Sequence, residues 1–148
     1  MRRLSFLVLL LALSACRGTQ PYTTEDFHQV RQAYATIPPI YRNFKAAYLA
    51  GNRAGILREY RREQRACRLV DVIDNRDTID PNINLFAVSA GLDTLCNDIE
   101  YAYTDWAMKH GYPYDRSITP GRPQDVFVDG DASLEKMPKQ MEHPKAFA

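Results

Sequence analysis

Apolar side chains recur with the period of an α-helix near the start of the chain. Four aromatic residues are spaced seven apart, and three more apolar residues fall on the same side: Phe27, Tyr34, Tyr41, Tyr48, Ile37, Ile40 and Phe44. Such a stripe is typical of a helix that buries one face. We expect this face to belong to the core. Because tyrosine also carries a polar hydroxyl, the alternative is an interface or a ligand cleft lined by Tyr34, Tyr41 and Tyr48.

Local signals mark the ends of this helical segment. A threonine cap followed by two acids indicates a start near residue 24, and Gly51-Asn52 indicates the end. Pro38-Pro39 interrupts the stripe, because proline lacks the N–H that a helix needs. The pattern predicts either two helices, near 24–36 and 39–50, or one kinked rod.

The next pattern predicts a helix from about Arg53 to Ile73. One side of its helical wheel is apolar and carries Ile56, Leu57, Tyr60, Cys67 and Val70. The opposite side gathers five arginines: Arg58, Arg61, Arg62, Arg65 and Arg68. These guanidiniums suit anionic lipid headgroups, lipopolysaccharide phosphates or an acidic protein surface. We expect a solvated face whose charges pair with Asp98, Asp105 or acids of the C-terminal tail, and binding of such an anionic surface is the alternative.

The clearest stripe predicts a last long helix over about 84–110. Its apolar positions are Leu85, Val88, Leu92, Leu95, Ile99, Tyr103 and Trp106. Asp80-Pro81-Asn82 indicates a loop before it, and Lys109-His110-Gly111 is a favourable helix end. Together the patterns predict an all-α fold, a small bundle of three to four helices over residues 23–111.

Cys67 and Cys96 lie on the inner sides of two consecutive predicted helices. Helices joined by a short loop pack antiparallel, which would bring these cysteines to comparable heights above the loop. We therefore predict one disulfide, worth about 3–4 kcal/mol in the chain-entropy model; two buried free thiols are the alternative. Because no CxxC occurs and His28, His110 and His143 are scattered, we expect neither redox catalysis nor a metal site.

Composition changes from Tyr112 onward, where prolines punctuate a polar segment of mixed charge. We expect residues 112–148 to form a Pro-rich, partly disordered tail that wraps the bundle or binds a partner. Residues 124–135 suit a brief extended piece followed by a helical turn. Acids around Gly130 resemble part of a calcium loop, but Lys136 stands where the closing glutamate belongs, so no calcium site is predicted.

The N-terminus has the build of an export signal. Arg2 and Arg3 precede an uncharged apolar run over 4–15 that is too short to span a bilayer. Leu13-Ser14-Ala15-Cys16 resembles the lipobox of bacterial lipoproteins. The resemblance implies cleavage before Cys16 and a diacylglycerol on its sulfur. Residues 1–15 would then be the signal peptide and 16–22 a lipidated tether.

Lipidation would set the location of the protein. Two or three acyl chains hold a protein durably on a membrane. Arg17 follows the cysteine, in place of the aspartate often linked to inner-membrane retention. The resemblance therefore implies a periplasm-facing anchor in the outer membrane, and the alternative is a soluble secreted protein.

Composition and motifs disfavour several function classes. The 148 residues carry a net charge of +1, with 25% charged and 45% hydrophobic residues, which suits one small domain and gives no sign of nucleic-acid binding. There is no GxSxG, HExxH or glycine-rich phosphate loop. Glu63 falls in the apolar sector of its helix, and we expect it at a rim or paired with an arginine or tyrosine rather than in catalysis. We expect no enzymatic activity and no cofactor.

The expected role is that of a non-enzymatic accessory protein that binds a protein partner in an envelope complex, such as a secretion or conjugation system. In architecture the chain is similar to the pilot lipoproteins of secretion systems, which are small, helical and disulfide-bonded. Two alternatives stay open. One is a binder of a small ligand or envelope polymer with an aromatic cleft, and the other is a plasmid- or phage-borne exclusion, immunity or lysis lipoprotein.

Overall fold

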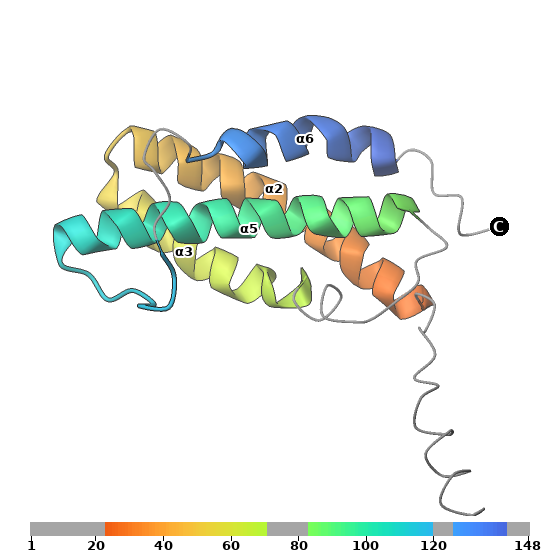
Figure 1. The fold of residues 1–148 in the computed structure, drawn as a ribbon, viewed down its shortest axis with the longest axis horizontal. Helices are drawn as coiled ribbons and strands as arrows, with labels where there is room; N and C mark the ends of the chain where they lie inside the picture. Colours follow the sequence, from red (N-terminus) through yellow and green to blue (C-terminus); the bar gives the residue numbers. More distant parts are fainter. Residues whose placement is uncertain (1–22, 71–82, 120–125, 142–148) are drawn as a thin grey trace, which may run out of the picture.

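The computed structural model describes residues 23–70, 83–119 and 126–141, which form four helices and no strand (Figure 1). The helices are α2 (Thr24–Leu49), α3 (Arg53–Ala66), α5 (Ile83–His110) and α6 (Val128–Met141). The predicted all-α bundle with one disulfide is confirmed. The signal and tether expected over 1–22 lie outside the described residues. Within the described ranges, no helix combines the length and apolarity needed to cross a membrane.

α2 begins with a reciprocal cap and continues through its two prolines. The Thr23 hydroxyl accepts the N–H of Asp26 at 3.2 Å, and the Asp26 carboxylate accepts the N–H of Thr23 at 2.7 Å. Of the two predicted arrangements, the single rod forms, with Pro38-Pro39 inside the helix. Ile37 and Ile40 are 0% and 2% exposed. Their burial on both sides of the prolines offsets the lost backbone hydrogen bonds.

A tight turn reverses the chain between α2 and α3. Gly51 has a φ of +63°, which costs little without a Cβ atom, and the side chain of Asn52 accepts the N–H of Gly55 at 3.1 Å to cap α3. α2 and α3 therefore pack side by side in opposite directions. α3 is shorter than the predicted helix, since it ends at Ala66 and Cys67 forms its C-cap.

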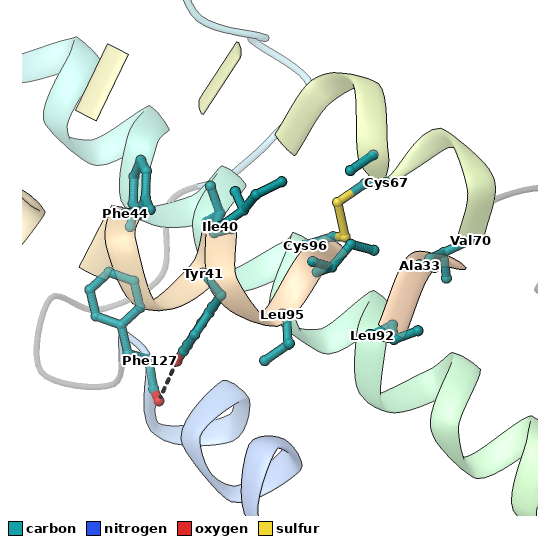
Figure 2. Packing of buried hydrophobic residues seen from close by; sticks show 14 of the residues in the cluster. Ala33, Ile40, Tyr41, Phe44, Cys67, Val70, Leu92, Leu95, Cys96 and Phe127 are labelled. Carbon is teal, nitrogen blue, oxygen red and sulfur yellow. Dashed lines mark hydrogen bonds between the residues drawn. A yellow bond between two sulfur atoms is a disulfide. The ribbon is translucent and has the colours of Figure 1, made fainter. Parts of the chain in front are cut away.

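α5 packs against all three other described helices. Its predicted stripe is buried throughout: Leu85, Val88, Leu92, Leu95, Ile99, Tyr103 and Trp106. Figure 2 shows Leu92 of α5 close to Ala33 of α2 and to Val70, which follows α3 in the chain. The three stripes that the sequence predicts most clearly therefore meet in the core.

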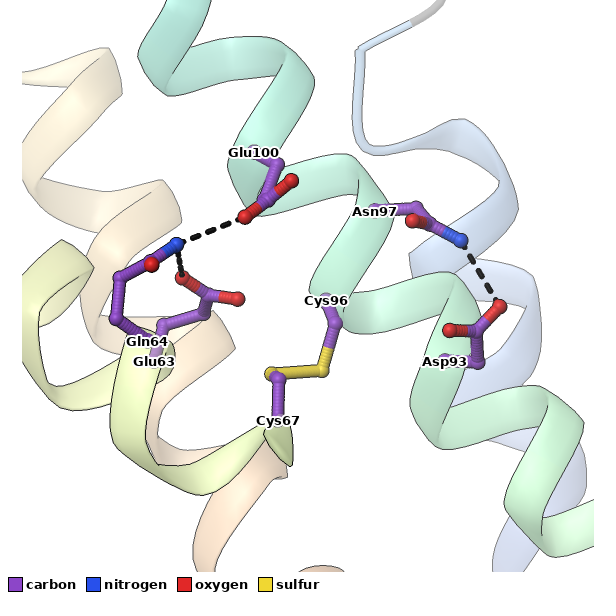
Figure 3. The surroundings of a disulfide bond; sticks show 7 residues. All are labelled: Glu63, Gln64, Cys67, Asp93, Cys96, Asn97 and Glu100. Atoms are coloured by element: carbon purple, nitrogen blue, oxygen red, sulfur yellow. Dashed lines mark hydrogen bonds between the residues drawn. A yellow bond between two sulfur atoms is a disulfide. The ribbon is translucent and has the colours of Figure 1, made fainter. Parts of the chain in front are cut away.

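The disulfide joins the end of α3 to the middle of α5 (Figures 2 and 3). The Cα atoms of Cys67 and Cys96 lie 6.1 Å apart, and the two residues are buried. The predicted pairing is thus confirmed, and the alternative of two free thiols is wrong.

Residues 126–141 correct the predicted extent of the bundle. The sequence predicts a Pro-rich, partly disordered tail here, with a brief extended piece and then a helical turn. Instead, α6 is a helix of 14 residues that packs along α5, on the opposite side from α3 (Figure 1). Residues at helical spacing face the core: Phe127, Gly130, Leu134, Met137 and Met141. Gly130 and Pro138 read as helix breakers, and they concealed this stripe.

Candidate functional site

The five predicted arginines project from one side of α3 and the residues just after it. Arg58, Arg61, Arg62, Arg65 and Arg68 are all exposed, and we call them the arginine face. The other side of the helix, including Ile56 and Ala66, is buried. Four of the five arginines surround an open depression of about 560 Å³, together with Ala54 and Leu57. The arginines and the buried residues thus lie on opposite sides of α3.

A buried carboxylate that the sequence analysis missed, Glu59, holds two of these arginines. Glu59 is 1% exposed. Arg58 Nε donates to its Oε1 at 2.7 Å, and Arg62 Nη1 donates to its Oε2 at 2.8 Å. Each carboxylate oxygen therefore has a cationic donor, which offsets part of the cost of removing the charge from water. The sequence signal was a glutamate with arginines one residue before it and three after it.

The remaining three arginines have no carboxylate partner in the described part of the chain. The expected partners are used elsewhere: Asp98 accepts an N–H of α6, and Asp105 accepts from Lys109 at 2.7 Å. The expected pairing of the arginines with these two acids is therefore not formed. Arg61, Arg65 and Arg68 remain available to an external anion.

Stacked tyrosines join α3 to α5 beside the arginine face. The rings of Tyr60 and Tyr103 are nearly parallel, with centroids 3.5 Å apart, and the Tyr103 hydroxyl donates to the carbonyl of Pro113 at 3.1 Å. Burial raises the pKa of Tyr103, and the nearby charge of Arg61 opposes that shift. This contact fixes α3 as a rigid support for the arginines.

Glu63 is buried at 2% exposure, so the expected rim position is wrong. The Gln64 amide donates to Glu63 Oε2 at 3.2 Å and to Glu100 Oε1 at 2.7 Å, and so connects α3 to α5 (Figure 3). A Glu63 carboxylate oxygen and the sulfurs of Cys67 and Cys96 lie within 4.8 Å of one another. Thiolates rather than disulfide sulfurs ligate metals, so this cluster offers no metal site while the bond is intact.

The aromatic stripe of α2 belongs to the core. Tyr41 is fully buried, and its hydroxyl donates to the carbonyl of Phe127 at 3.0 Å and to Asp131 Oδ1 at 3.2 Å (Figure 2). Tyr48 packs edge-on against the Phe127 ring at 5.5 Å, and Tyr34 is half-buried against the same core. Tyr41 and Tyr48 are thus used in packing against Phe127 and α6, which supports the expected core role of this stripe rather than an aromatic cleft.

A polar cluster that sequence reasoning missed fixes the start of α6. Asp98 Oδ2 accepts the N–H of Gly130 at 2.8 Å, and Lys45 forms an ion pair with Asp131. Burial raises the pKa of the Asp98 carboxyl, and the Gly130 N–H opposes this shift. These groups bind one another across three helices, which indicates a structural role.

Comparisons with known proteins found no match for this chain among protein-family models, curated proteins or solved structures. The function is therefore inferred from the residues themselves. Among the described residues, the arginine face is the site where exposed charge, helical spacing and an open surface coincide.

Proposed function

We propose that this chain is a lipid-anchored, non-enzymatic accessory protein of a bacterial envelope, held in the outer membrane through Cys16 with its bundle facing the periplasm. The supporting observation is the division of its three cysteines. Cys67 and Cys96 are paired inside the bundle, whereas Cys16 stands apart in a sequence that resembles a lipobox. Disulfides persist in oxidising compartments such as the periplasm, so the pair and the lipobox agree on one location.

Exposed apolar side chains at the end of the bundle away from Thr24 support the binding of a protein partner. Leu49, Met108 and Val128 are 71%, 51% and 58% exposed. They come from the last residue of α2, the last turn of α5 and the first residue of α6. Those segments meet around Tyr48, whose ring packs on Phe127 and whose hydroxyl donates to α5 at 3.3 Å. Apolar side chains of this size favour contact with another protein, and we place the partner-binding surface here.

The polar groups inside the bundle support a role in binding rather than in chemistry. A pocket of about 200 Å³ beside the disulfide contains Glu63 and Glu100, but Gln64 binds both carboxylates and so joins two helices. Tyr41 is likewise used to hold α6. We therefore assign these residues to the fold, and the partner to a secretion, conjugation, exclusion or immunity system of the envelope.

Labelling with radioactive palmitate in a Gram-negative host tests the anchor. The wild-type chain is expected to carry label and to fractionate with the outer membrane. Cys16→Ser should lose the label, whereas the matched control Cys67→Ser should keep it. A wild-type chain without label, or label that persists in Cys16→Ser, would overturn the proposal.

A photo-crosslinking residue at Met108 tests the partner-binding surface in intact cells. Phe86 is the matched control, because it is also on α5 and 54% exposed but lies near the other end of the helix. We expect a discrete crosslinked protein from position 108 and none from position 86. Equal crosslinking from both positions would contradict this placement.

A further inference from the structure

We infer that the arginine face docks on the anionic phosphate headgroups of the leaflet that carries the anchor, so that the bundle lies with α3 against the membrane. The inference rests on the proposed lipid anchor and adds a second contact with the same membrane. Its basis is the row of five exposed guanidiniums on one side of α3 and the residues just after it, three of them without a carboxylate partner among the described residues.

The arrangement of the helices allows α3 to reach the membrane. In Figure 1 the first turns of α2 and the later turns of α3 lie on the same side of α5, and α6 lies on the other. Six residues lie between Cys16 and Thr23, so the seven Cα-to-Cα steps from one to the other span at most about 25 Å. An anchor at Cys16 therefore keeps α3 within reach of the headgroups.

The chemistry of the face fits phosphates better than an acidic protein. Guanidinium groups bind phosphate oxygens through paired N–H donors, and a row of them matches a plane of headgroups. Protein interfaces instead need an apolar centre with large anchoring side chains. Here only Ala54 and Leu57 contribute apolar surface to the depression between the arginines. Leu57 is itself partly covered, so this centre is too small for a protein hot spot.

The test measures how fast individual arginines react with phenylglyoxal on vesicles. The chain from residue 16 onward, which contains every described residue, is oxidised and coupled through Cys16 to a maleimide lipid. The coupling is selective because the other two cysteines form the disulfide. Vesicles of phosphatidylethanolamine and phosphatidylglycerol (3:1) are compared with phosphatidylcholine vesicles. Mass spectrometry measures how much of each arginine has reacted with phenylglyoxal over time. The artificial anchor makes the result independent of whether cells lipidate Cys16.

We expect Arg61, Arg65 and Arg68 to react about fivefold more slowly on the anionic vesicles, and the difference to vanish in 1 M salt. Arg42 is the internal reference, since it is exposed on α2 next to Tyr41, which contacts the start of α6. Equal rates on both vesicles would overturn the inference. Slowing on isolated envelopes but not on pure lipid would overturn it too, in favour of an acidic protein.

A variant pair separates docking by the arginine face from general attraction of positive charge. Arg61→Gln/Arg65→Gln/Arg68→Gln removes three charges that form no ion pair within the described residues, so the bundle should fold. Arg58 and Arg62 should then react at the same rate on both vesicles. The control Arg116→Gln/Lys136→Gln/Lys139→Gln removes three exposed charges elsewhere, keeps Arg42 as the reference and should keep the slowing. Identical behaviour of the two variants would contradict docking through α3.

Discussion

The carboxylate of Asp98 on α5 accepts the backbone N–H of Gly130 in the first turn of α6 at 2.8 Å. The first N–H groups of a helix have no partner inside the helix, and the positive end of its dipole favours a negative charge. A side chain of one helix thus caps the start of another. Tyr41 adds a second polar contact by donating to the carbonyl of Phe127. α6 is therefore fixed to the bundle at its first turn.

Gly130→Ala is expected to destabilise the fold by about 2–3 kcal/mol. A Cβ atom at this position would lie 2.5 Å from the Tyr41 hydroxyl oxygen and 2.6 Å from Asp98 Oδ2, so the start of α6 must move and lose both contacts. Urea unfolding followed by circular dichroism measures the change. The control Asp129→Ala, an exposed side chain in the same turn, should stay within about 0.5 kcal/mol. A Gly130→Ala protein as stable as this control would contradict the close packing.

Asp98→Asn should flatten part of the pH dependence of stability. Burial raises the folded-state pKa of Asp98 above its ordinary value of 3.8, helped by the charges of Asp129 and Asp131. At a pH between 3.8 and the raised pKa, the folded chain binds more protons than the unfolded chain. Ionisation of Asp98 therefore lowers the free energy of unfolding as pH rises through this range. Asparagine still offers an oxygen to Gly130 but does not ionise. Relative to Asp98→Asn, the wild type should therefore lose stability as pH rises from about 4.

Unfolding free energies of both proteins between pH 4 and pH 7 measure this difference. Asp115→Asn provides a contrast of opposite sign, because the N–H and hydroxyl of Ser117 lower the pKa of the Asp115 carboxyl. Relative to that variant, the wild type should gain stability as pH rises through the acid range. A pH profile of Asp98→Asn that is parallel to the wild type would show that Asp98 titrates normally.

The three long apolar stripes and the two inner cysteines made most of the fold predictable. Periodicity identifies a buried helix face without knowledge of what covers it, and Cys67 and Cys96 fell on such faces. α6 was not predicted, because one of the positions on its buried side is a glycine. Gly130 is not there for local helix propensity but because Tyr41 and Asp98, distant in sequence, occupy the space of a side chain. A constraint of that kind is visible only in three dimensions.

The candidate site, like the fold, was only partly predictable from the sequence. The exposed arginines followed from helical spacing alone, since residues three or four apart share a side. Glu59 was missed, because a wheel of apolar residues gives no reason to bury a carboxylate. Glu59 can be buried because the long side chains of Arg58 and Arg62 reach its carboxylate and donate hydrogen bonds to it. Hydrophobic patterning thus located the surface but not the charge pairs that organise it.

Cys67→Ser or Cys96→Ser should lower the free energy of unfolding by about 3–4 kcal/mol under oxidising conditions. The bond links residues 29 apart in sequence and therefore restricts the unfolded chain. Chemical unfolding with and without a dithiol reductant measures the effect. With reductant, the wild type should approach the stability of the variants. Wild type and variants of equal stability without reductant would contradict the bond.

Arg58→Gln/Arg62→Gln should destabilise the bundle by about 1–2 kcal/mol, because it leaves the buried Glu59 carboxylate without cationic donors. The effect stays this small because the arginines are 67% and 44% exposed, and water screens their charges. The matched control Arg61→Gln/Arg65→Gln removes the same charge from the same helix but no ion pair within the described residues. It should stay within about 0.5 kcal/mol of the wild type in urea unfolding.

Adding Glu59→Leu to the Arg58→Gln/Arg62→Gln chain separates the effect of the buried charge from that of the arginine stems packing on α3. If the loss arises from an unpaired carboxylate at 1% exposure, an apolar side chain of similar length should restore most of the stability, since a buried apolar group needs no partner. If the loss arises from the arginine stems packing on α3, the triple variant should stay as unstable as the double variant. Restoration would establish that the role of Arg58 and Arg62 in the fold is to neutralise the buried Glu59 carboxylate.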